Sequence, residues 1–130
     1  MAEPLLLRIV VGVASLVPVT GGAAGVLLGP AMVGLPSGDV GADSHFRYLS
    51  GLLLGLGLMF GATVPRIEQA GPTFRILGTV VIVGGLARLL ALVLHGPPNV
   101  PTLCALAMEL GVTPALMIWQ ARAAARARSR

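Results

Sequence analysis

Two oppositely charged residues, Arg88 and Glu109, lie deep inside apolar stretches that are long enough to cross a membrane. A charge in hydrocarbon costs about 2.5 to 3.5 kcal/mol, so each of these residues needs a partner or a water-filled cavity. The two side chains can serve as partners for each other. Alternatively, they form a ligand or catalytic site, in which Glu109 is a general acid or base and Arg88 stabilises developing negative charge.

Helix geometry places both residues at the same depth. Arg88 comes seven residues before His95, where its apolar stretch ends, and Glu109 comes seven residues after Thr102, where the next stretch begins. At a rise of about 1.5 Å per residue, both lie about 10 Å below the same membrane surface. The short connection makes the two helices antiparallel neighbours. We therefore expect an ion pair between Arg88 and Glu109.

Other polar side chains are expected at the same end of the protein, whereas the opposite half is almost purely apolar. The sequence predicts an outward-opening polar pocket walled by Leu, Val and Gly, and its candidate residues are His45, Arg47, Tyr48, Ser50, Arg88, His95 and Glu109. The simpler interpretation makes the two histidines solvated residues at helix ends and Tyr48 an anchor at the membrane interface. In that interpretation the ion pair only locks two helices together.

Composition identifies a membrane protein. Of the 130 residues, 55% are hydrophobic and 11% are charged, with a mean hydropathy of +0.90, whereas soluble domains contain about 25% charged residues. Apolar runs bounded by Gly and Pro predict helices at about 5–28, 44–64, 73–94 and 102–120, with a basic tail at 121–130. Asp43 or Ser44 is expected to cap the second helix. The fold class is therefore all-α, a four-helix transmembrane bundle forming one domain.

Arginine placement predicts the orientation. All nine basic residues are Arg, and most of them flank the ends of the predicted helices on the side that carries both termini. Because cytoplasmic flanks collect positive charge, both termini are expected in the cytoplasm. The net charge of +4 is explained by this topology, with weak attraction to anionic lipid headgroups as a by-product, so we expect no nucleic-acid partner.

Small residues and prolines are expected to shape the helix contacts. Glycines four residues apart allow close helix approach, and the pairs in this chain are Gly21 with Gly25, Gly51 with Gly55, and Gly57 with Gly61. Gly84 is expected to share one side of its helix with Arg88. Pro18 and Pro114 are expected to kink their helices. Cys104 is alone, which excludes a disulfide within the chain and a cysteine-based metal site.

Several short elements together resemble a bacterial family of small four-helix membrane proteins, classed as a domain of unknown function (4345). The elements are Asp43 to Tyr48 with Gly51 and Gly55, Ile67-Glu68, Phe74-Arg75, Gly84 to Arg88, Gly96-Pro97, and Glu109 with Pro114. The resemblance covers nearly the whole chain and implies a four-helix membrane fold in the bacterial inner (cytoplasmic) membrane. It implies no activity and brings no functional residues.

Three functional hypotheses follow from these residues. The first is a structural or accessory membrane protein, or a binder of a small lipophilic molecule. The second is a membrane-embedded enzyme, isomerase-like or hydrolase-like, that acts on a lipophilic substrate near Arg88 and Glu109. The third is a heme protein with His45 or His95 as ligand, by loose analogy with styrene oxide isomerase. No cofactor or metal is predicted, the expected partner is the lipid bilayer, and homo-oligomerisation stays open.

Overall fold

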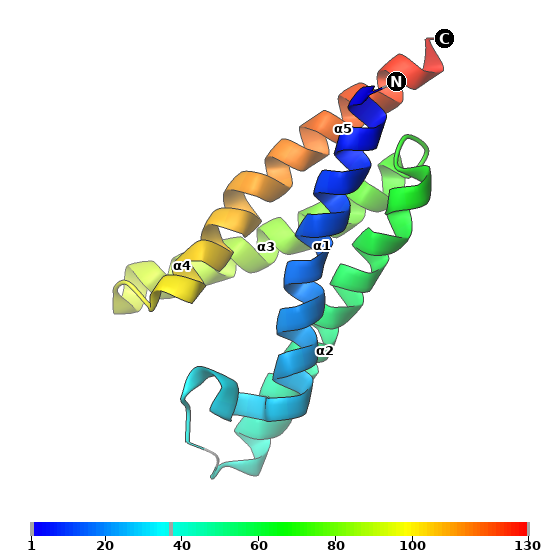
Figure 1. Ribbon diagram of the computed structural model, residues 1–130. Helices are drawn as coiled ribbons and strands as arrows, with labels where there is room; N and C mark the ends of the chain where they lie inside the picture. Colours follow the sequence, from blue (N-terminus) through cyan, green and yellow to red (C-terminus); the bar gives the residue numbers. More distant parts are fainter. Residues whose placement is uncertain (1, 37, 130) are drawn as a thin grey trace. The chain divides into compact units, whose positions relative to one another are not determined.

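The described part of the chain, residues 2–36 and 38–129, is almost entirely helical and contains no strand in the computed structural model (Figure 1). The elements in chain order are α1 (Ala2–Leu28), the 3₁₀ turn η1 (Gly29–Val33), α2 (Val40–Thr63), the 3₁₀ turn η2 (Val64–Arg66), α3 (Gly71–His95), α4 (Val100–Ala107), the π-helical segment η3 (Met108–Val112) and α5 (Thr113–Arg128). Because α4, η3 and α5 follow one another without a break, the described residues form four long helical segments.

Each long segment is long enough and apolar enough to cross a membrane. The candidate spans are Glu3–Val33, Val40–Arg66, Gly71–His95 and Val100–Arg128. Large apolar side chains stay exposed along them, for example Leu27, Val93 and Ile118, as expected for surfaces that face lipid rather than water. These observations confirm the predicted all-α, four-helix transmembrane class.

Two compact units make up the described chain, residues 2–7 with 66–129 and residues 8–65, and each is considered by itself. In the unit of residues 8–65, α1 and α2 touch through small residues. A Cβ atom added at Gly22 would lie 2.7 Å from Leu54 Cα, and one added at Gly57 would lie 2.8 Å from Val19 N. The backbones of α1 and α2 therefore approach each other closely at these glycines, as in many membrane helix pairs.

The Arg47 guanidinium links the start of α2 to the end of α1. Arg47 donates from Nε to Asp43 Oδ2 at 2.7 Å, and from Nη1 to the carbonyl oxygens of Val26 and Leu27. The last carbonyls of a helix have no partner within the helix, so Arg47 supplies donors to the end of α1. Gly29 follows with a φ of +64°, a conformation that favours glycine, and leaves room for Arg47 and Asp43.

In the unit of residues 2–7 and 66–129, α3 runs beside the segment formed by α4, η3 and α5 (Figure 1). Three glycines mark the contact along α3: Gly71 faces Gln120, Gly78 faces Met117, and Gly85 faces Leu110. Gln120 is fully buried and donates from Nε2 to the Ile67 carbonyl at 2.8 Å. The two helical segments are therefore antiparallel, with the start of α3 level with the middle of α5.

Helix boundaries differ from the sequence prediction at several ends. Asp39 caps α2, since its Oδ1 accepts from Gly41 N at 2.8 Å and from Ala42 N at 3.1 Å, so the expectation of a cap at Asp43 or Ser44 is wrong. The helix begins at Val40, four residues earlier than predicted, so Asp43 lies inside its first turn, where it accepts from Arg47. The segment expected as a basic tail continues α5 as helix up to Arg128, and Arg126 forms an ion pair with Glu3.

Candidate functional site

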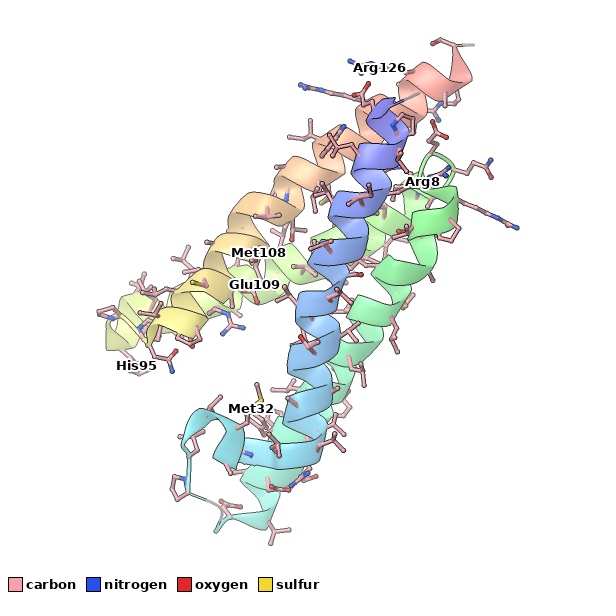
Figure 2. The ribbon with its side chains drawn as sticks, in the orientation of Figure 1. Arg8, Met32, His95, Met108, Glu109 and Arg126 are labelled. Atoms are coloured by element: carbon pink, nitrogen blue, oxygen red, sulfur yellow. The ribbon has the colours of Figure 1, made fainter. Side chains whose placement is uncertain are left out.

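The predicted ion pair between Arg88 and Glu109 is present. Arg88 donates from Nε to Glu109 Oε2 at 2.9 Å and from Nη2 to Glu109 Oε1 at 3.1 Å. This two-pronged geometry is the strongest arrangement that a guanidinium and a carboxylate can adopt. It links α3 to η3, and Figure 2 shows Glu109 beside α3 and His95 at the end of α3.

Exposure is unequal within the pair. The Glu109 side chain is 17% exposed, whereas the Arg88 side chain is 38% exposed. Both carboxylate oxygens accept from Arg88, but a guanidinium carries more N–H donors than two hydrogen bonds can use. Part of the Arg88 guanidinium therefore points away from Glu109 and reaches the surface of its unit.

A π-helical segment, Met108–Val112, carries Glu109. Its cause is visible in the sequence: Pro114 has no N–H for the Leu110 carbonyl, and its ring would clash with that carbonyl in a regular α-helix. The wider turn relieves the clash. Thr113 completes it by donating both its backbone N–H and its hydroxyl to the Met108 carbonyl, the latter at 3.0 Å. Insertions of this kind in α-helices occur frequently at functional sites.

Close helix approach at Gly85 brings Glu109 within reach of Arg88. A Cβ atom added at Gly85 would lie 2.8 Å from Leu110 Cδ2 and 2.9 Å from Glu109 Cβ, whereas one added at Gly84 would meet nothing within 4 Å. Gly84, which was expected to share one side of α3 with Arg88, therefore does not contact the neighbouring helix, whereas Gly85 does. Gly85 is three residues from Arg88, so the two share one side of the helix.

The other candidate residues lie at the end of α3 and on α2. His95 is exposed at the last residue of α3. His45, Arg47, Tyr48 and Ser50 lie in the first half of α2, in the unit of residues 8–65. Tyr48 is 62% exposed, Arg47 is engaged by Asp43 and by the end of α1, and Ser50 donates to the Phe46 carbonyl. That all seven residues line one pocket stays a prediction.

Sequence reasoning missed the π-helical segment and the role of Gly85. Pro114 four residues after Leu110 was the available signal for the first, and the adjacent pair Gly84-Gly85 left the second ambiguous. Neither residue type carries chemistry of its own. In residues 2–36 and 38–129, no group of three or more His, Cys, Asp or Glu side chains is arranged to hold a metal ion.

Four membrane-length helices and a charged pair between two of them define the class of this chain, an integral membrane protein with an ion pair inside its apolar region. The chain belongs to the family described as a domain of unknown function (DUF4345), whose pattern matches residues 6–120. This confirms the resemblance seen in the sequence. Neither a curated protein nor a solved structure matches the chain.

Proposed function

We propose that this chain binds a small lipophilic molecule through the part of the Arg88 guanidinium that Glu109 leaves unoccupied. The supporting observation is that Glu109 accepts one hydrogen bond from Arg88 Nε and one from Nη2, while the Arg88 side chain stays 38% exposed. In hydrocarbon, an N–H group without an acceptor costs several kcal/mol. A ligand oxygen at the free donors removes that cost.

Charge favours a neutral ligand. Glu109 already balances the Arg88 charge, so an anionic ligand would be repelled by the nearby carboxylate, whereas a carbonyl oxygen gains a charge-assisted hydrogen bond without that repulsion. α3 carries no other charged side chain between Arg75 and His95, so the surroundings of this point are apolar. The proposed ligand class is therefore a lipophilic ketone, ester or quinone.

The direction of the Arg88 side chain distinguishes between such a ligand and a lipid headgroup at the nearer membrane surface as the group that Arg88 binds. The end of α3 nearer to Arg88 is His95, but long side chains in a helix lean toward its N-terminus. Arg88 therefore leans toward the middle of the span and away from the nearer headgroups. This favours an acceptor that enters the apolar region of the bilayer.

A membrane-embedded enzyme is the second candidate, supported by the π-helical segment that carries Glu109. As a general acid, Glu109 would need a proton, yet both of its oxygens accept hydrogen bonds from Arg88. Binding therefore needs no rearrangement of the pair, whereas proton transfer through Glu109 requires the pair to open. For this reason binding is the favoured proposal. Binding is compatible with a structural role of the ion pair, since the same pair links α3 to η3.

Ligand-dependent stability tests the binding proposal. Decylubiquinone serves as the neutral carbonyl probe, and decylbenzene has a similar apolar tail without an acceptor. We expect decylubiquinone at about a hundred times its Kd to add about 2.7 kcal/mol to the unfolding free energy of the detergent-purified protein. Decylbenzene should add much less. Thermal unfolding, monitored by circular dichroism, measures both.

Two variants locate the effect. The double variant Arg88→Leu with Glu109→Leu should lose the difference between the two probes, whereas Gly84→Ala, a change in open space one turn away, should keep it. An equal response to both probes in the wild-type protein would overturn the proposal. Conversion of a lipophilic substrate that stops in Glu109→Gln, while binding persists, would favour the enzyme instead.

We also propose that the protein lies in the bacterial inner (cytoplasmic) membrane with both termini in the cytoplasm, because Arg66, Arg75 and Arg122 gather at one end of α3 and α5. Cysteine labelling checks this orientation. In a Cys104→Ser background, Asn99→Cys should react with a membrane-impermeant maleimide in intact cells, whereas Ser129→Cys should react only after the membrane is disrupted. The reverse pattern would place the termini outside.

A further inference from the structure

Arginines collect at the end of the unit where α3 begins and α5 ends. Gln120 faces Gly71 and bonds the Ile67 carbonyl, so these three residues lie at one level. The exposed arginines near this level are Arg66, Arg75, Arg122, Arg126 and Arg128. This end also carries Glu3 and Glu68, and Glu3 pairs with Arg126. The arginines outnumber the glutamates, so this end of the unit is positively charged.

One side of α5 combines an aromatic residue with two of these arginines. Trp119, Arg122 and Arg126 are spaced by three and seven residues, which places them on the same side of a helix. Arg128 lies on the opposite side, about half a turn away from Trp119 at 100° per residue. Glu3 engages Arg126, whereas no described residue forms an ion pair with Arg122.

Depth places this side of α5 at the membrane surface. The candidate span of α3 begins at Gly71, level with Gln120. Arg122 comes two residues after Gln120, and its long side chain leans back toward the N-terminus of α5. The Arg122 guanidinium therefore lies near the boundary between hydrocarbon and headgroups, with Trp119 beside it at the depth that tryptophan prefers.

We infer that Arg122, next to Trp119, forms a binding site for the phosphate headgroup of an anionic phospholipid. A guanidinium presents paired donors that match phosphate oxygens, and the neighbouring arginines add attraction for negatively charged lipids. A lipid is the occupant because the site lies at the end of a membrane span and Trp119 offers an apolar surface for the first part of an acyl chain. This inference does not depend on a ligand at Arg88.

Fluorescence of Trp119, the single tryptophan of the chain, reports directly on this site. The protein is placed in two vesicle preparations, each made of equal fractions of phosphatidylcholine and phosphatidylglycerol. In one preparation the phosphatidylcholine carries bromine atoms on its acyl chains, and in the other the phosphatidylglycerol carries them. Because bromine quenches tryptophan at short range, stronger quenching by brominated phosphatidylglycerol measures its preference over phosphatidylcholine. We expect Arg122→Gln to reduce this preference about fivefold, the effect of one arginine near a charged membrane surface.

Arg128→Gln is the matched control, since it removes the same charge from the opposite side of α5 and should change the preference much less. High salt should abolish the preference in the wild-type protein, because it screens the exposed charges. Equal quenching by the two brominated lipids in the wild-type protein would overturn the inference. Equal losses in Arg122→Gln and Arg128→Gln would also overturn it, because they would indicate a diffuse charge effect without a site.

Discussion

Replacing one member of the ion pair, in Arg88→Leu or Glu109→Leu, should lower the free energy of unfolding by about 3 kcal/mol, because each change leaves an unpartnered charge between apolar helices. The double variant should lose less than about 1 kcal/mol, since leucines of similar size can replace a buried ion pair almost without cost. The unfolding free energies of the four proteins in detergent form a double-mutant cycle that isolates the coupling between the two side chains.

Arg75→Leu provides the control, because no described residue forms an ion pair with Arg75, and it should change stability by less than about 0.5 kcal/mol. Two additive losses in the double variant would contradict the assignment of the pair as a coupled unit. The cycle and the ligand test ask different questions. The cycle measures the interaction between Arg88 and Glu109, whereas the decylubiquinone experiment measures the binding of a ligand oxygen to the remaining N–H donors of Arg88.

The ion pair could be predicted from the sequence because hydrocarbon restricts the choices so strongly. A charged residue far inside a span must find a partner, and helix rise alone placed Arg88 and Glu109 at equal depth. The membrane class and the four spans follow from the same physics, since composition and span length decide them. These predictions depend on single residues and on lengths, which the sequence gives directly.

Helix contact faces could not be predicted in the same way. A π-helical segment adds a residue to one turn, so any helix face calculated with a regular period from Thr102 onward changes direction at Met108. Adjacent glycines are also ambiguous, because which of Gly84 and Gly85 faces the neighbouring helix depends on a rotation of about 100° per residue. The structure selects Gly85.

The cap of α2 and the role of Arg47 show a second limit. In the sequence, Asp43 has the residue type and position expected of a helix cap. A carboxylate can also pair with a cation one turn further along a helix, and Arg47 is four residues away. The helix begins at Val40 with Asp39 as its cap, and Asp43 lies inside the first turn, where it binds Arg47. Because Arg47 also donates to the end of α1, its position depends on a contact between distant residues that sequence periodicity does not contain.

Gly22→Ala should destabilise the pair of α1 and α2 by about 2 to 3 kcal/mol, in the upper range for overpacking a close contact. The added methyl group would lie 2.7 Å from Leu54 Cα and would also press against Leu54 N. These are backbone atoms, so no change of side-chain rotamer can make room and the helices must separate. The denaturant midpoint of the detergent-purified variant, compared with that of the wild-type protein, measures the loss.

Gly21→Ala makes the same chemical change on the adjacent residue, where an added Cβ meets nothing within 4 Å, and it should be neutral or slightly stabilising because alanine favours helix more than glycine. Gly25→Ala offers a contrasting case, since its methyl group would meet Ser50 Oγ and Cβ, which are side-chain atoms. Ser50→Gly should therefore restore part of the stability lost in Gly25→Ala, whereas Leu54→Ala should restore little in Gly22→Ala. Equal rescue in both pairs would contradict the backbone contact at Gly22, and with it the close approach that holds α1 against α2.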